Sequence, residues 1–266
     1  MSNLDNENII HKTFNDIEII QFRKLLEFSN LVHCYTLRKH GININIDPKN
    51  REILKESYCK ISNILNINEN NIIQPYQTHT DNIEIANLPN IEFKDVDGVI
   101  TDKKNIIIAT TSADCISLLF YDKRKNIIAD VHSGWRGTVK QIGKKAVEKM
   151  IKEYNSNPED IICCICPSIR KCHFEVDTDV MKIFKNGFEY TGKINEIISV
   201  GKNIEGKQKY NIDTVLINKI ILEEAGLKKE NIIDSGICTV CNSEYFHSYR
   251  VDKQEAGRNG AFIGLI

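Results

Sequence analysis

A cysteine and a histidine at the ends of two apolar runs are the first residues whose types and spacing indicate chemistry. The runs flank four polar residues, 122–125, a common length for a hairpin loop. If Tyr121 pairs with Asn126, the same register places Cys115 directly opposite His132. Opposed residues share a face of the sheet, with Cβ atoms about 4.5–5.5 Å apart. A thiolate and an imidazole at that separation could bind one cation, because Zn–S bonds are about 2.3 Å and Zn–N bonds about 2.0–2.1 Å long.

A third ligand is available in His79, which follows the strand-like run Ile72–Tyr76 and could reach the same sheet edge. Three nitrogen and sulfur ligands with one open position describe a catalytic zinc centre rather than a structural one. Other roles stay open, because a histidine at a strand end is usually a hydrogen-bonded surface residue and a cysteine among apolar residues usually packs as a small hydrophobe. Cys115 and His132 would also suit the nucleophile and base of a cysteine hydrolase.

The segment Ser133–Gly137 could bind an anion. It lies between a predicted strand and a helical pattern that begins at Thr138. Glycines let backbone N–H groups converge, and a helix N-terminus favours negative charge. Phosphate could therefore bind here, with Arg136 adding positive charge. The alternative is a tight turn in which Trp135 packs into the core.

The other cysteines allow a second interpretation as metal ligands. Cys238 and Cys241 form a CxxC pair, and Cys163, Cys164 and Cys166 form a second group about 70 residues earlier. The earlier group lies in a strand-like run, whose alternate residues face opposite ways. We therefore interpret these cysteines as structural thiols. His173 and His247 are candidate contacts to a substrate.

Strands and helices alternate irregularly along the chain. β character marks the segments 17–22, 31–37, 72–79, 99–101, 106–111, 116–121, 126–131, 161–166, 232–237 and 261–265. Helical signals mark the segments 48–65, 138–154, 176–185 and 214–225. Several adjacent strands look hairpin-connected, which favours the α+β class, with mixed β-sheets and flanking helices. We find no linker, so we expect a single domain over residues 1–266.

Composition argues against several classes of function. The 266 residues include 35 Lys and Arg against 36 Asp and Glu, a net charge of −1, so no positive excess is available to neutralise nucleic acid. No apolar run approaches the roughly 20 residues that span a bilayer, and the N-terminus lacks the features of a secretory signal. We therefore expect a cytoplasmic protein that binds neither nucleic acid nor membrane. Its nine cysteines are then thiols or ligands rather than a disulfide framework.

Several motifs together resemble the YfiH-type family, from roughly residue 31 to the C-terminus. The family has been described as multicopper polyphenol oxidoreductases, or laccase-domain proteins, and as purine nucleoside phosphorylases. The motifs are Gln77-Thr78-His79, Asp97–Asp102, Ala113-Asp114-Cys115, Val131–Gly137, Cys166–Ile169, Phe174–Val176, Asn211–Asp213, Cys238-Thr239, Phe246–Arg250 and Gly257-Arg258. The resemblance implies that His79, Cys115 and His132 are metal ligands. Departures at Thr80 and at residues 170–173 do not touch these ligands.

The resemblance implies a metal-dependent purine nucleoside phosphorylase, with Cys115 and His132 at the catalytic centre. Adenosine, inosine or methylthioadenosine would react with phosphate to give a free base and a ribose 1-phosphate, and adenosine deamination is a candidate side activity. Zinc is the expected metal, and copper is an alternative. The arginines in the matched segments are candidate substrate contacts, because a guanidinium fork suits phosphate. They are Arg38, Arg250 and Arg258, and Arg136 joins them from the glycine turn.

Three other functions stay open at this point. A Cys–His hydrolase that edits peptidoglycan precursors would need no metal. A copper-dependent polyphenol oxidoreductase would need ligands for several coppers, and the chain has only seven histidines. A zinc-stabilised interaction domain would have a closed site with four ligands and no turnover.

Overall fold

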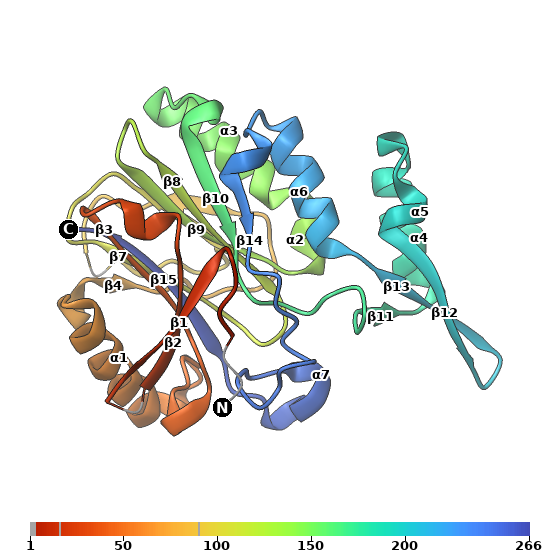
Figure 1. Cartoon of the computed structure of the whole chain (residues 1–266), viewed down its shortest axis with the longest axis horizontal. Coiled ribbons are helices and arrows are strands. Elements are labelled where there is room, and N and C mark those ends of the chain that lie inside the picture. Colours follow the sequence, from red (N-terminus) through yellow and green to blue (C-terminus); the bar gives the residue numbers. More distant parts are fainter. Residues whose placement is uncertain (1–3, 16, 90) are drawn as a thin grey trace.

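Two six-stranded β-sheets form the centre of the structure (Figure 1). The computed structural model describes residues 4–15, 17–89 and 91–266. The first sheet has the order β1 (Ile9–Phe14), β2 (Ile17–Phe22), β3 (Leu31–Thr36), β15 (Asn259–Leu265), β7 (Ile107–Ser112), β4 (Ile72–Ile73). The second has the order β14 (Ile232–Asp234), β10 (Ile161–Ile165), β8 (Ile116–Asp122), β9 (Ile127–Ser133), β6 (Gly98–Thr101), β5 (Ile83–Ile85). Both sheets are mixed, which confirms the predicted α+β class.

The two sheets share one apolar core. Leu119 and Tyr121 of β8 pack in the same cluster as Phe22 and Ile263 of the first sheet. Leu118 and Phe120, the alternate residues of β8, face the helices on the other side. Strands such as β8 are thus buried on both faces, which explains their continuous apolar runs.

Helices cover the outer faces of both sheets (Figure 1). α1 (Arg51–Leu65) packs on the first sheet, and α3 (Ile142–Tyr154) and α6 (Thr214–Glu224) pack on the second. The helical signal predicted at 138–154 includes α3, whose apolar residues Ile142, Ala146, Val147 and Met150 are buried, although Ile151 is exposed.

A smaller unit projects to one side of the sandwich (Figure 1). Its three-stranded sheet has the order β11 (Glu175–Val176), β13 (Lys207–Ile212), β12 (Ile198–Ile204), and it carries α4 (Thr178–Phe188) and α5 (Ile194–Ile197). Phe184 and Phe188 of α4 pack with Ile217 and Ile221 of α6, so one apolar cluster joins this unit to the rest.

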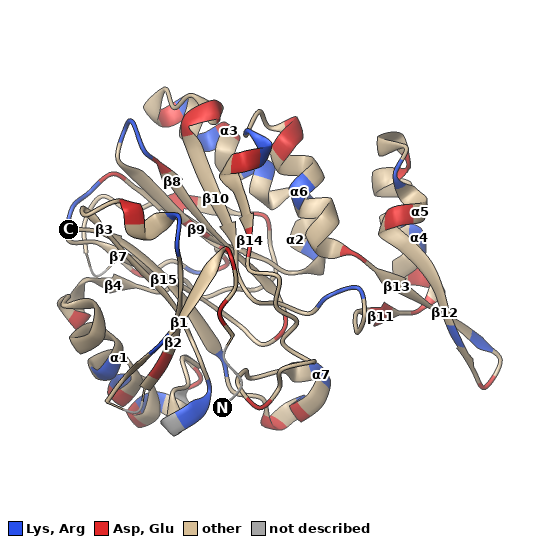
Figure 2. Ribbon diagram, viewed as in Figure 1, with Lys and Arg blue, Asp and Glu red and all other residues tan. Residues whose placement is uncertain are grey.

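The remaining helices are short. They are α2 (Trp135–Val139), α7 (Tyr249–Asp252) and the 3-10 turns Leu25–Glu27, Lys39–Gly41, Pro48–Asn50, Glu69–Asn71, Pro158–Asp160, Glu189–Thr191, Lys229–Asn231 and Lys253–Glu255. Within the described ranges, no helix combines the length and apolarity that crossing a bilayer requires. Acidic and basic residues are interspersed on the helices and loops, and the central strands carry few of either (Figure 2).

The predicted helix and strand boundaries fail at two places near the site. The segment 138–154 is not one helix, because Gln141 has a φ of 59° and separates α2 from α3. The run 72–79 is a strand only at its first two residues. His79 therefore lies in a loop rather than at the end of a strand.

The β8–β9 hairpin has its four-residue loop one position later than predicted. Asp122 pairs with Ile127, so the loop consists of residues 123–126. The Asp122 side chain accepts hydrogen bonds from the backbone N–H groups of Arg124 and Lys125 at 2.9 and 3.0 Å. Asn126 closes the loop with a φ of 54°, a left-handed conformation that asparagine tolerates.

The predicted register was consequently wrong by two residues. Tyr121 does not pair with Asn126; its hydroxyl group lies 2.8 Å from the Asn126 side-chain oxygen. Ser117, and not Cys115, lies opposite His132. A shift by two residues keeps the side chains on the same face of the sheet, so Cys115 still approaches His132, from a bend just before β8.

Candidate metal centre and active site

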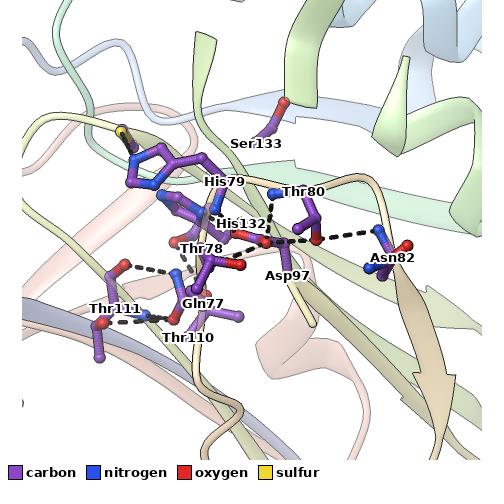
Figure 3. A network of polar contacts seen from close by, with 12 residues as sticks. Gln77, Thr78, His79, Thr80, Asn82, Asp97, Thr110, Thr111, His132 and Ser133 are labelled. Carbon is purple, nitrogen blue, oxygen red and sulfur yellow. Dashed lines mark hydrogen bonds and ion pairs between the residues drawn. The ribbon is translucent and has the colours of Figure 1, made fainter. Parts of the chain in front are cut away.

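The structure brings together the three side chains that the sequence indicated as metal ligands. His79, Cys115 and His132 each offer a ligand atom, and all three atoms lie within 4.8 Å of one another. Sγ of Cys115 is 3.9 Å from Nε2 of His79. The two imidazole rings face each other edge to face, with 4.9 Å between their centroids (Figure 3).

The three residues come from three different segments. His132 is in β9, Cys115 precedes the neighbouring β8, and His79 lies in a loop with a φ of 63°. Gln77 fixes this loop to the edge of β7. Its side-chain amide donates to the Thr111 carbonyl at 2.9 Å and accepts from the Thr111 N–H at 2.8 Å, as a neighbouring strand would.

Asp97 connects the segments that carry His79 and His132. It is fully buried, and among the described residues five groups bond to its carboxylate, all of them as donors. Oδ1 accepts from Nδ1 of His132 at 2.8 Å and from the His79 N–H at 3.1 Å. Oδ2 accepts from the N–H groups of Thr78 and Thr80 at 3.3 and 2.7 Å, and from the Thr80 hydroxyl at 2.7 Å (Figure 3). Because Nδ1 of His132 is engaged, its Nε2 is left for a ligand.

The sequence did not predict this role for Asp97. An aspartate before a glycine at the start of a strand also suits an ordinary turn. The only sequence signal for Asp97 is that it lies in a segment, Asp97–Asp102, that resembles the family. That resemblance does not reveal which hydrogen-bond donors surround the carboxylate.

Electrostatics favour the thiolate at this site. Burial raises the pKa of Cys115, but hydrogen bonds from His132 and His79 and the charges of both imidazoles lower it to about 6. Burial lowers the pKa of His132, but hydrogen bonds to Asp97 and Cys115 raise it to about 9. Burial raises the pKa of Asp97, and hydrogen bonds from His132 and Thr80 lower it to about 2. The thiolate is the form of cysteine that binds metals and acts as a nucleophile.

A cavity of about 410 Å³ opens beside the three residues, within the size range of small-molecule sites. Trp135, Phe174 and Tyr249 contribute aromatic rings to its wall, and Arg250 and Arg258 contribute positive charge. Such a wall can hold a flat apolar ring beside an anionic group.

The two cavity arginines are held partly by backbone carbonyls. Arg250 donates from Nη2 to the Glu175 carbonyl at 3.1 Å. Arg258 donates from Nη1 to the carbonyls of Ala256 and Gly257, both at 2.9 Å. These contacts orient each guanidinium group. Within the described part of the chain, the other guanidinium N–H groups of both residues make no bond to a carbonyl.

Other predicted substrate contacts lie outside the cavity wall. Arg38 forms an ion pair with Asp252 at 3.0 Å. Arg136 is exposed and stacks over the Trp135 ring at 4.3 Å. Nε2 of His247 lies 2.8 Å from the carbonyl of Ile42 in a buried position. The structure therefore brings two of the four predicted arginines to the site.

The glycine turn makes room for one of the three candidate ligands. α2, which follows it, is only five residues long. The Ser133 hydroxyl is buried against Thr138 and Asn218, at 2.9 and 3.2 Å. A Cβ added to Gly134 would lie 2.7 Å from Cδ2 of His79. Glycine at this position therefore leaves room for the histidine ring.

Asp114 ties the Cys115 bend to two distant segments. Its Oδ1 accepts from the Thr239 hydroxyl at 2.6 Å, and its Oδ2 accepts from the Arg250 N–H at 2.7 Å. The backbone at Asp114 has a φ of 87°, which is uncommon for a residue other than glycine. Asp114 thus positions the first turn of α7, which carries Arg250, close to Cys115.

The sequence of this chain is similar to a known family and to named proteins of that family. A family model described as multi-copper polyphenol oxidoreductase laccase matches residues 40–266. The purine nucleoside phosphorylase YlmD of Bacillus subtilis is 37% identical over 172 residues, which cover 65% of this chain and 59% of that protein. A purine nucleoside phosphorylase of Clostridium acetobutylicum is 33% identical over 231 residues, covering 86% of this chain and 89% of that protein.

Solved structures share the fold. The YfiH protein of Bacillus licheniformis superposes with a TM-score of 0.86 at 24% identity, covering 96% of this chain and 99% of that one. YlmD of Geobacillus stearothermophilus superposes with a TM-score of 0.85 at 22% identity, covering 97% and 99%. From the extent of the family match and the relative in Clostridium, the chain belongs to the YfiH-type family, whose model is described as multi-copper polyphenol oxidoreductase laccase.

Proposed function

We propose that this protein is a metal-dependent purine nucleoside phosphorylase. Adenosine, inosine and methylthioadenosine are its proposed substrates, with phosphate as the second substrate. One observation carries the proposal: three nitrogen and sulfur ligands open onto a cavity lined by aromatic rings and two arginines. The names of its relatives in Bacillus and Clostridium support the same activity.

The side chains fit a zinc ion. Two ligands of one tetrahedral zinc, a thiolate and an imidazole, lie ~3.6 Å apart, close to the 3.9 Å between Cys115 and His79. The carboxylate of Asp97 behind His132 is the arrangement that orients metal-bound histidines. Three ligands leave one position open toward the cavity, and a bound cation would supply a Lewis acid there. Copper would also bind such ligands tightly, so copper in a purified sample is not evidence for an oxidase.

The cavity residues would hold the two substrates against each other. Trp135, Phe174 and Tyr249 would pack on the purine, and Arg250 and Arg258 would bind phosphate. A phosphate oxygen then bonds to C1′ of the ribose while the bond from C1′ to the purine nitrogen breaks. The bonding electrons leave with the purine, and the proton of hydrogen phosphate ends on the free base. Holding both reactants in one orientation is the main contribution of such a cavity to the rate.

The test combines metal analysis with a nucleoside screen, with and without phosphate. His79→Ala, Cys115→Ala and His132→Ala should each lower bound zinc and turnover together, because each removes one of three ligands. Cys59→Ala, at an exposed cysteine of α1, is the matched control and should behave as the wild type. Release of base without phosphate, or full activity without metal, would contradict the proposal.

A cysteine hydrolase is the second candidate, because the lowered pKa of Cys115 beside His132 also suits a nucleophile and its base. Under this mechanism His79→Ala would have a far smaller effect than Cys115→Ala. Alkylation of Cys115 would abolish activity, and chelation followed by zinc addition would leave it unchanged. Adenosine deamination is a proposed side activity of the metal-dependent enzyme, and it would be measured as ammonia released from adenosine.

A further inference from the structure

A second cluster of metal-binding side chains lies outside the active-site cavity. Cys172, His173, Cys238 and Cys241 each offer one ligand atom, and the four atoms lie within 4.8 Å of one another. Three sulfurs and one imidazole nitrogen have no apolar reason to gather here, since Cys172 and Cys241 are exposed. We propose that these four residues bind a structural zinc ion.

The distances match a tetrahedral zinc site. Bond lengths of about 2.3 Å to sulfur and 2.0–2.1 Å to nitrogen imply edges of ~3.8 Å between sulfurs and ~3.6 Å between sulfur and nitrogen. Sγ of Cys172 lies 3.6 Å from Sγ of Cys238 and 3.8 Å from Sγ of Cys241. Nδ1 of His173 lies 3.2, 3.7 and 3.5 Å from the sulfurs of Cys172, Cys238 and Cys241.

The ligand set selects the metal and its role. Soft thiolates with one imidazole favour zinc over magnesium or calcium. Four protein ligands complete the tetrahedron, so this site has no open position for a substrate, unlike the three-ligand site at Cys115. The proposed ion is therefore structural.

The fold explains why residues so far apart in sequence meet. β10 and β14 are parallel neighbours, so the chain leaves both strands at the same edge. A bridge between Ser168 and Cys238 continues this pairing beyond the strands, with the Thr239 N–H donating to the Ser168 carbonyl at 3.1 Å. The first loop then supplies Cys172 and His173, and the second supplies the CxxC pair.

The surroundings of Cys238 suit a bound thiolate. Burial raises its pKa, but hydrogen bonds from the backbone N–H groups of Cys241, Arg170 and Val240 and from Cys172 lower it below its usual value. Arg170 is anchored in turn by its ion pair with Asp234. Cys163, Cys164 and Cys166 are not among the four clustered residues, and burial raises the pKa of each of these three thiols.

The proposed site replaces the interpretation of Cys238 and Cys241 as structural thiols. The sequence pattern suggested the cysteines at 163–166 as their partners, whereas the structure places them beside Cys172 and His173. The ion would hold together two loops that each lead to a residue of the cavity wall. Phe174 follows the first ligand pair, and Tyr249 follows the second.

Metal content of the full-length chain, purified without chelator or histidine tag, tests the site. Wild-type protein should hold a second equivalent of zinc beyond the one at the cavity. Cys172→Ser and Cys241→Ser, both at exposed positions, should each lose about one equivalent and keep the other. His79→Ala should lose the cavity ion alone, so the result does not depend on the proposed activity. Cys59→Ser is the matched control and should retain the wild-type content.

Cobalt substitution identifies the ligands independently. In the His79→Ala background, bound cobalt should show strong thiolate charge-transfer and tetrahedral d–d bands, and Cys241→Ser added to that background should weaken both. Equal metal content in wild type, Cys172→Ser and Cys241→Ser would overturn the proposal. So would a disulfide among the three cysteines in protein purified under reducing conditions, because disulfide sulfurs cannot serve as thiolate ligands.

Discussion

Substitution of Asp97 by asparagine tests how the site at His132 is held in place. Asp97→Asn keeps the shape of the side chain but replaces one acceptor oxygen by an NH₂ donor. Each of the five groups that bond to the carboxylate is a donor. Only two of them can accept instead: the Thr80 hydroxyl by rotating, and His132 by changing its tautomer. If the NH₂ lies at Oδ2, it meets the N–H groups of Thr78 and Thr80. If it lies at Oδ1, it meets the His79 N–H, and His132 must accept at Nδ1, which leaves the proton on Nε2.

Either orientation of the new side-chain amide should lower the free energy of unfolding. One or two buried donors are left without a partner, at about 1–3 kcal/mol each, so the free energy of unfolding should fall by ~3 kcal/mol. Loss of the group that orients a metal-bound histidine typically costs about 10–100-fold in metal affinity, and we expect a loss of this size for zinc at the cavity. Turnover should fall together with zinc occupancy.

The assay is urea denaturation for stability and chelator competition for zinc affinity, on the same preparations. Asp95→Asn is the matched control. Asp95 is exposed, its side chain accepts one hydrogen bond from Thr78 at 3.0 Å, and its φ of 55° suits asparagine equally well. We expect this control to change stability by no more than about 0.5 kcal/mol. Wild-type zinc affinity in Asp97→Asn would refute the role assigned to the carboxylate.

Three further predictions concern the ligand geometry, a buried ion pair and the core. Gly134→Ala should lower zinc affinity and turnover while the fold is kept, because the new Cβ would meet His79 at 2.7 Å; metal titration and circular dichroism check this. Asp234→Asn should cost ~2 kcal/mol at pH 7, since burial raises the pKa of Asp234 but Arg170 lowers it to about 2, below the ~3.9 of an unfolded chain. Its carboxylate stabilises the fold above that value, so the gap between variant and wild type should close as pH falls from about 4 to 2; a gap that stays constant in urea denaturation would count against the ion pair. Phe120→Ala, at a fully buried position, should cost ~3–5 kcal/mol, and a loss below about 1 kcal/mol would show that the sheet–helix core is not packed as described.

Local sequence patterns predicted the central strands well and the peripheral ones poorly. The segment predicted at 17–22 matches β2 at both ends, and nearly all of its residues are buried in the structure. β12 was missed, since all of its residues are exposed or half-buried and its partner strand, not its own apolar pattern, holds it in place. Strands of this kind are decided by pairing with another segment rather than by propensity.

The candidate active site shows the same division. The types of the ligand residues, their places next to apolar runs and the family resemblance together indicate His79, Cys115 and His132 from the sequence alone. The hairpin register that linked two of them was wrong by two residues, because Asp122 and Asn126 determine where the loop turns. The predicted cluster survived this error, since a shift by two keeps the same face of the sheet.

By itself, the sequence determined which chemical groups are available and which segments form the core. It also determined the α+β class, through apolar periods that arise from local backbone geometry. Only the tertiary structure decided that Asp97 holds His132, that two of four candidate arginines reach the cavity, and that Cys172 and His173 meet a CxxC pair about 65 residues away. Such contacts join side chains that are distant along the chain, and their geometry follows from sheet order and strand direction, which no local pattern encodes.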